Sequence, residues 1–167
     1  MKAIQALRDE EVVVFLDADV SDFPGRMDAV LDPILVEGYD VVISNRITRF
    51  MEKGSMTRLQ VAGNRLTVFL IRLFWGYTYH DLGPFRGVTR EALSAAKMKD
   101  PNYGWTVELQ IKAIQKKMKI AQVDVPYRKR RKGRSKVSGT IRGSVLAGVK
   151  ILFTVFQLKI RGLSWDI

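Results

Sequence analysis

The stretch "VVVFLDADVSDFP", residues 12–24, joins five apolar residues to two carboxylates, Asp17 and Asp19, and ends at a proline. A short β-branched run bounded by polar residues is typical of a strand that is buried on both faces, as in a parallel sheet. In such sheets, ligands bind beyond the carboxyl ends of the strands. The stretch therefore predicts a buried strand that ends at a ligand site.

The segments that follow predict an α/β fold. Apolar residues at helical spacing predict a helix within residues 23–38, in which Pro33 is expected to cause a kink and Gly38 to be the stop. Residues 39–46 are expected to form a second buried strand. A β–α–β order favours a parallel or mixed sheet flanked by helices.

The rest of the chain continues the alternation of strands and helices. We expect the end of a helix at 1–10, helices at 55–76 and 102–118, a turn, short strand and helix within 81–97, a strand within 119–130, and a terminal apolar helix from 143. No internal repeat or flexible linker interrupts this pattern. We therefore expect one folded domain over residues 1–138, followed by an amphipathic membrane-surface helix and tail over 139–167.

Composition narrows the classes of function. The 167 residues contain no cysteine, which excludes disulfides and thiolate metal sites and fits a reducing compartment. The single histidine, His80, excludes a multi-histidine metal cluster and leaves one position for the commonest general base. We expect His80 itself to be structural.

Positive charge dominates the chain, with 28 Lys and Arg against 17 Asp and Glu. The surplus is concentrated in "RKRRKGRSK", residues 128–136, and the largely apolar residues 143–156 that follow carry one charge, at Lys150. A basic run before an apolar helix is typical of binding to an anionic membrane surface. A non-enzymatic basic module that binds nucleic acid or membrane is the alternative, but the run lacks interleaved aromatic residues and familiar nucleic-acid motifs.

The two carboxylates of the first stretch allow two interpretations. Asp17 and Asp19 in a turn can hold Mg²⁺ or Mn²⁺, which in turn carries a diphosphate. They can equally be ordinary turn and helix-cap residues before Pro24. The spacing alone does not decide between them, because two aspartates two apart are common.

Five motifs together resemble the inverting family-2 glycosyltransferases, and among them the polyprenyl-phosphate (dolichyl-phosphate) glucosyl- and mannosyltransferases. They are VVVFLDADVSDFP, VVISNR, DLGPFRGVTREAL, YGWTVELQIKA and RKGRSKVSGT, which occur in the family's order across nearly all of residues 10–156. The resemblance implies a GT-A-type fold. It also implies transfer of a sugar, with inversion, from a nucleotide-diphosphate donor of the UDP-glucose or GDP-mannose type to a polyprenyl phosphate.

The resemblance assigns roles around the first two strands. Asp17 and Asp19 match the family's carboxylates that hold the divalent cation and diphosphate, and Arg46 matches a phosphate-binding position. Asp81 and Arg86 match a segment on the acceptor side, for which a buried Asp–Arg pair that holds a turn is the alternative. At Ser21 many relatives carry glutamine as a further ligand, so water is expected to complete the coordination here.

The resemblance also assigns roles further along the chain. Trp105 and Glu108, which share a helix face, are expected under the sugar and the acceptor phosphate, although Trp105 can equally be a core aromatic residue. Arg134, Ser135 and Lys136 are expected in a loop that folds over the donor and binds the acceptor phosphate. The preceding basic residues, 128–132, are expected to contact lipid head groups.

Relatives begin with a strand and a Gly- or Asn-rich turn that bind the nucleotide base and ribose. Residue 1 here corresponds to the helix before the first stretch, so we expect about the first third of the catalytic domain to be missing. The free sheet edge is then expected to pair with a missing N-terminal segment or with another copy. We expect residues 1–167 alone to transfer sugar poorly or not at all, and to be bound peripherally at the cytoplasmic face of the cell membrane.

Overall fold

The computed structural model describes residues 11–131 and 141–163. Its elements are β1 (Val12–Phe15), η1 (Pro24–Arg26), α2 (Asp28–Leu35), β2 (Val41–Asn45), α3 (Arg58–Trp75), β3 (Arg86–Thr89), α4 (Arg90–Ala96), α5 (Trp105–Gln115), β4 (Ile120–Asp124) and α6 (Ile141–Leu163). The helix end predicted for residues 1–10 lies outside the described residues.

The four strands form one mixed sheet in the order β1-β3-β2-β4. β3 runs antiparallel to both β1 and β2, whereas β2 and β4 pair in parallel. β1 and β2 therefore point the same way, as the β–α–β pattern predicts, but β3 lies between them. The carboxyl ends of β1, β2 and β4 consequently meet at the edge of the sheet where β3 begins.

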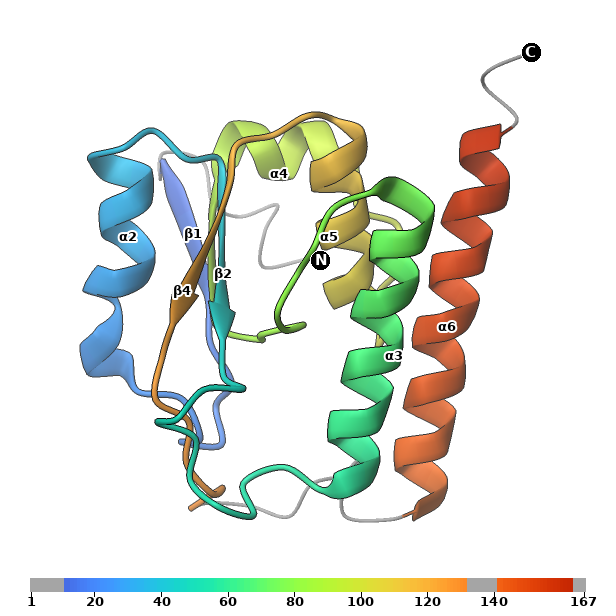
Figure 1. Ribbon diagram of the computed structural model, residues 1–167. Coiled ribbons are helices and arrows are strands. Elements are labelled where there is room, and N and C mark those ends of the chain that lie inside the picture. The colour runs from blue at the N-terminus through green and yellow to red at the C-terminus, as the bar shows by residue number, and fades with distance from the viewer. Residues whose placement is uncertain (1–10, 132–140, 164–167) are drawn as a thin grey trace.

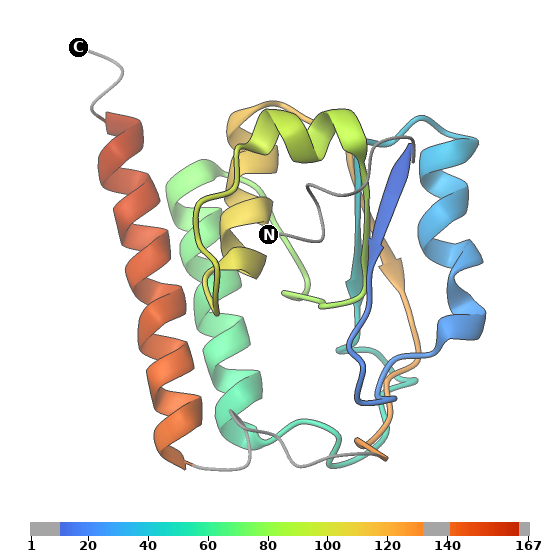
Figure 2. The same ribbon diagram turned by 180° about the vertical axis from the view of Figure 1, so that it is seen from behind.

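Helices cover both faces of this sheet (Figures 1 and 2). α2 lies on one face, where Val30 and Ile34 pack against Val42, Phe85 and Val125. On the other face α3, α4 and α5 enclose the larger core, and α6 packs against α3 and α5 on the outside. The predicted α/β architecture with a terminal helix is confirmed.

Close contact between α2 and β3 depends on a glycine. A Cβ atom at Gly87 would lie 2.8 Å from both Ile34 Cδ1 and Val30 Cγ1, which is closer than carbon atoms pack. Because residue 87 has no side chain, β3 can pack in close contact with α2 while lying between β1 and β2 in the sheet. This close approach lies between elements distant in sequence and was not apparent from the local pattern.

The ends of the helices follow local chemistry. The helix predicted within residues 23–38 is shorter, because only Asp28–Leu35 is α-helical and Pro24–Arg26 forms a 3₁₀ turn. α3 begins at a capping box in which Thr57 and Gln60 bond to each other's backbone N–H groups. It ends at Gly76, whose φ of 73° lies in the left-handed region that favours glycine.

Candidate active site

Residues 17–22, called here the acidic turn, follow β1 at the edge where β3 begins. The Ser21 N–H donates to Asp19 Oδ1 at 2.9 Å, and the Asp17 N–H donates to Asp22 Oδ2 at 3.2 Å. Val20 has a φ of 65°, a left-handed conformation that is rare for a β-branched residue. Such strain persists only where the surroundings impose it, and it is concentrated at functional sites.

Burial shapes the charge of the acidic turn. It raises the pKa of Asp22 to about 6, and burial together with the charge of Asp19 raises the pKa of Asp17. Asp22 is 1% exposed, and its Oδ1 atom has no hydrogen-bond partner among the described residues. The turn thus gathers hard carboxylate oxygens, one of them unpaired, which are the donors that Mg²⁺ and Mn²⁺ prefer.

This donor set fits a divalent cation only in part. The described ranges hold no group of three His, Cys, Asp or Glu side chains arranged to bind a metal ion. Asp17 and Asp19 could supply carboxylate oxygens, and the remaining ligands would come from a bound diphosphate or from water.

A buried ion pair lies beside the acidic turn, between Arg46, directly after β2, and Asp81. Arg46 Nε and Nη2 donate to Asp81 Oδ2 and Oδ1 at 2.7 and 3.0 Å, and the Arg46 backbone N–H donates to Asp81 Oδ2 at 2.9 Å. The guanidinium carbon also lies 5.0 Å from the centre of the Tyr127 ring. Although burial lowers the pKa of Arg46, the hydrogen bonds and charge of Asp81 raise it above its ordinary value.

Arg86 has a different environment from Arg46. Its guanidinium is buried and donates to the carbonyl oxygens of Leu82, Gly83, Pro84 and Thr106. Burial, and then the charge of a neighbouring arginine, lower its pKa to about 10. The Asp–Arg pair considered from the sequence therefore forms with Arg46, while Arg86 holds the backbone that carries Asp81.

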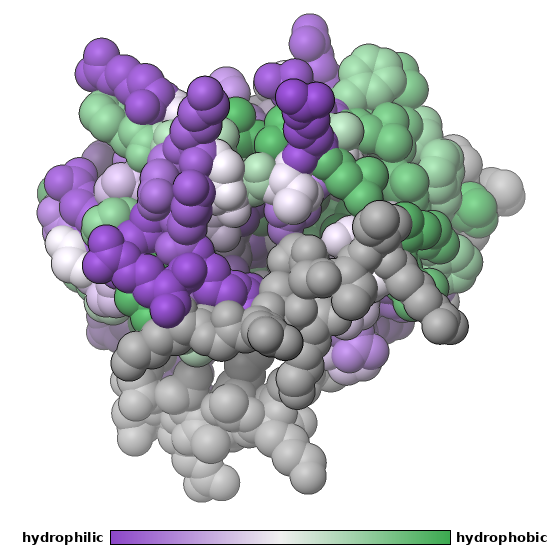
Figure 3. All heavy atoms as spheres, turned by 90° about the horizontal axis from the view of Figure 1, so that it is seen from below, coloured by the Kyte–Doolittle hydropathy of each residue, from purple (hydrophilic) through white to green (hydrophobic). Residues whose placement is uncertain are grey.

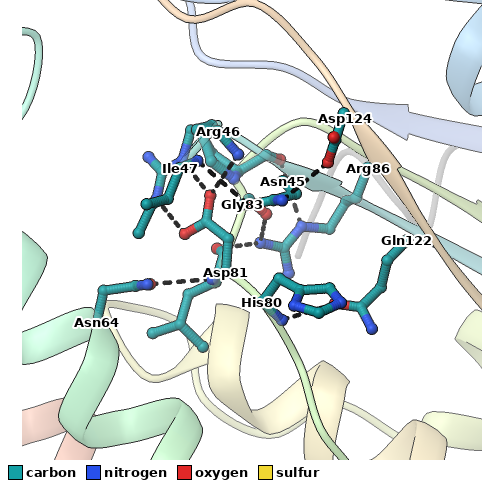
Figure 4. A network of polar contacts seen from close by, with 12 residues as sticks. Asn45, Arg46, Ile47, Asn64, His80, Asp81, Gly83, Arg86, Gln122 and Asp124 are labelled. Atoms are coloured by element: carbon teal, nitrogen blue, oxygen red, sulfur yellow. Dashed lines mark hydrogen bonds and ion pairs between the residues drawn. The ribbon is translucent and has the colours of Figure 1, made fainter. Parts of the chain in front are cut away.

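Residues 78–85 form a loop that side chains from three elements hold in place, and Figure 4 shows Asn64 and Gln122 among these side chains. These side chains belong to α3, α5 and β4 and bond to the backbone of the loop. The contacts are Asn64 Oδ1 with Leu82 N (3.0 Å), Gln110 Nε2 with Asp81 O (3.0 Å), and Gln122 Oε1 with His80 N (2.7 Å). These bonds fix the course of the loop that carries Asp81 to Arg46. His80 takes part in them through its backbone N–H.

Trp105 and Glu108 lie at the start of α5. The Trp105 ring lies 4.5 Å from the Phe15 ring and 5.6 Å from the Arg86 guanidinium, which places it at the end of β1. Glu108 is buried, accepts hydrogen bonds from the backbone N–H groups of residues 99 and 100, and pairs with Lys112 at 2.7 Å. Glu108 therefore fixes the loop before α5, and a contact of either residue with substrate stays a prediction.

The basic segment 127–131, called here the strap, lies against the acidic turn. Arg130 Nη2 pairs with Asp19 Oδ2 at 2.7 Å, and Arg128 Nε donates to the Val20 carbonyl oxygen at 2.7 Å. These arginines were expected at lipid head groups, and the sequence analysis missed their place at the site. The predicted Arg134, Ser135 and Lys136 lie outside the described residues.

The site therefore combines an acidic turn, a rigid Arg46–Asp81 pair and a basic strap at one edge of the sheet. Residues 1–95 match the sequence model of Glycosyl transferase family 2. The chain belongs to this family. The match includes the acidic turn, Arg46, Asp81 and Arg86, which are the predicted site residues before α5.

Relatives of this family-2 chain have been named in archaea and bacteria. The dolichyl-phosphate hexose transferase of Haloferax volcanii is 32% identical over 154 residues, which cover 92% of this chain and 65% of the relative. An uncharacterized glycosyltransferase of Mycobacterium tuberculosis is 32% identical over 140 residues, covering 81% of this chain and 61% of the relative. The chain thus spans less than two thirds of the length of these relatives.

Solved structures show that the fold is of the GT-A type. Glucosyl-3-phosphoglycerate synthase from Mycobacterium tuberculosis, in complex with Mn²⁺, UDP-glucose and phosphoglyceric acid, has a TM-score of 0.73 and 21% identity. The superposition covers 95% of this chain and 52% of that one. The mixed sheet with its flanking helices is thus the GT-A arrangement that the resemblance predicted.

Proposed function

We propose that the chain is the diphosphate-binding and acceptor-facing part of a glycosyltransferase. It moves a sugar, with inversion, from a nucleotide-diphosphate donor of the UDP-glucose or GDP-mannose type to a polyprenyl or dolichyl phosphate. The observation that carries this proposal is the strained acidic turn beside the Arg46–Asp81 pair in a family-2 chain. The Haloferax relative, by its name, and the mycobacterial neighbour, by its bound phosphoglyceric acid, support an acceptor that carries phosphate.

The residues of the site suit transfer to a phosphate. A phosphate acceptor is already ionised near neutral pH, so the reaction needs positioning and charge stabilisation rather than a strong general base. Asp17 and Asp19 would hold a divalent cation, which when bound neutralises charge that grows on the leaving diphosphate. Arg134 and Lys136 would add cations on the acceptor side.

The surface of α3 and α6 supports a membrane-bound acceptor. In Figure 3 the hydrophobic residues gather on the side of the molecule where these two helices lie. The exposed apolar side chains there are Leu59, Leu66, Phe69, Leu73, Val145, Leu146, Val149, Phe153, Phe156 and Ile160. An apolar surface of this kind marks an interaction site, here for the lipid acceptor and its bilayer.

The one charged residue near the middle of α6, Lys150, is held in an ion pair. Lys150 pairs with Asp100 at 2.8 Å, so its ammonium group is held against the loop before α5. Residues Gly143–Ile160 are long and apolar enough to cross a membrane by length and composition alone. Because α6 also packs along α3 and α5, we propose that it lies in the interface at the cytoplasmic face rather than spanning the bilayer.

Transfer of radiolabelled sugar tests the proposed function. Purified residues 1–167, and the same chain extended by any in-frame upstream segment encoded with it, are given UDP-glucose or GDP-mannose with Mn²⁺. Dolichyl phosphate in vesicles and phosphoglyceric acid in solution are supplied together as competing acceptors. We expect a labelled lipid that requires Mn²⁺, with more product from the extended chain. Label that appears on phosphoglyceric acid instead, or no transfer by either chain, would contradict the proposal.

A further inference from the structure

The strap is attached to the acidic turn by two kinds of contact. Backbone bonds hold its course, because the N–H groups of Arg128 and Arg131 donate to the carbonyl oxygens of Ser21 and Asp19 at 3.2 and 3.4 Å. The Arg130 guanidinium, by contrast, reaches a carboxylate oxygen of Asp19 at 2.7 Å. The position of the strap is therefore separable from the contact that Arg130 makes.

The partners of Asp19 leave one place for a cation. Its Oδ1 atom accepts the Ser21 N–H, and its Oδ2 atom faces the Arg130 guanidinium. The side chain of Arg130 is 36% exposed, whereas that of Asp19 is 12% exposed. Arg130 can therefore swing into solvent without unfolding the turn, while Asp19 stays where it is.

We propose that Arg130 is the exchangeable counter-ion of Asp19, which a divalent cation must displace in order to bind the acidic turn. This inference rests on the proposed cation site. Asp19 Oδ2 cannot face a guanidinium nitrogen at 2.7 Å and coordinate a metal ion from the same side. Asp22 in the same turn is buried, and its Oδ1 atom has no hydrogen-bond partner among the described residues, so it is a further carboxylate oxygen that a divalent cation could use.

Competition of this kind has a measurable size. The Arg130 side of this pair is open to solvent, and ion pairs that solvent reaches are weak, so we expect the arginine to lower cation affinity by about two- to five-fold. Displacement also frees a guanidinium, a group suited to bidentate phosphate contact, beside the turn. The cation and Arg130 would then act in sequence on one diphosphate.

Titration of Mn²⁺ alone into the 167-residue chain tests this exchange, with free Mn²⁺ followed by electron paramagnetic resonance. Arg130→Gln should bind Mn²⁺ about two- to five-fold more tightly than wild type, and Arg130→Lys should lie between them. Arg131→Gln is the matched control, because it removes the same charge from the neighbouring residue. Arg131 contacts Asp19 through its backbone N–H, which the substitution keeps. Thermal unfolding by circular dichroism confirms that all variants fold.

The outcomes separate the exchange from the cation site. Unchanged or weaker Mn²⁺ binding by Arg130→Gln would overturn the exchange while leaving the proposed function in place. An equal gain in Arg131→Gln would also overturn it, because the effect would then be one of net charge. If neither wild type nor Arg130→Gln binds Mn²⁺, both the exchange and the cation site on which it rests are wrong.

Discussion

Replacing Asp81 by asparagine separates its role in holding Arg46 from a direct role in binding acceptor. The side chain of Asp81 is 0% exposed and that of Arg46 is 12% exposed, and two side-chain hydrogen bonds join them. Breaking one partner of a buried pair leaves an uncompensated charge, which costs about 3 kcal/mol or more. For a chain of this length that is a fall in melting temperature of roughly 6–12 °C.

Urea unfolding at pH 7 measures this loss, and a double variant tests its cause. Arg46→Met with Asp81→Asn removes both charges and keeps an amide oxygen as acceptor for the backbone N–H of residue 46. The double variant should therefore recover at least about half of the stability that Asp81→Asn alone loses. Asp124→Asn is the control, because Asp124 accepts from Asn45 at an exposed site and should lose less than about 0.5 kcal/mol. A fully stable Asp81→Asn protein that no longer transfers sugar would refute the structural role.

Two further variants address the acidic turn and the α3–α6 surface. In EDTA, the stability of wild type relative to Asp22→Asn should fall by up to about 3 kcal/mol as pH rises from about 4 to about 6, because the folded-state pKa of about 6 lies above the ordinary 3.8. Stability is measured by thermal unfolding at each pH. If wild type instead gains stability relative to Asp22→Asn between pH about 4 and about 6, the pKa of Asp22 is not raised and the prediction is wrong. Phe153→Glu should weaken sedimentation with dolichyl-phosphate vesicles, whereas the exposed Lys116→Glu on the end of α5 should change it less; equal losses would indicate a purely electrostatic attachment.

Much of the fold could be predicted from local pattern. β1 and β2 lie in short runs rich in β-branched residues, β4 lies in a segment of alternating pattern, and α3 and α5 carry apolar residues at helical spacing. The place of β3 between β1 and β2 could not be predicted in the same way. It depends on pairing between distant segments and on the missing side chain of Gly87, which lets α2 pack closely.

Part of the candidate site could likewise be predicted from local sequence, and part depends on contacts between distant segments. The carboxyl ends of parallel strands meet at one edge, so Asp17, Asp19 and Arg46 could be placed together from the sequence. The partner of Arg46 could not, because Asp81 reaches it through a loop whose course other elements fix. Arg130 was missed because seven of the nine residues 128–136 are basic, and nothing local distinguishes the one that contacts Asp19.

Binding of UDP with and without Mn²⁺, followed by calorimetry on wild type and Asp19→Ala, tests the central claim that the acidic turn holds a diphosphate through a cation. Asp124→Asn supplies the same loss of negative charge at the same edge of the sheet. We expect binding that needs Mn²⁺, falls at least about ten-fold in Asp19→Ala, and is retained in the control. Binding that is unchanged in Asp19→Ala, or equally strong in EDTA, would contradict the account.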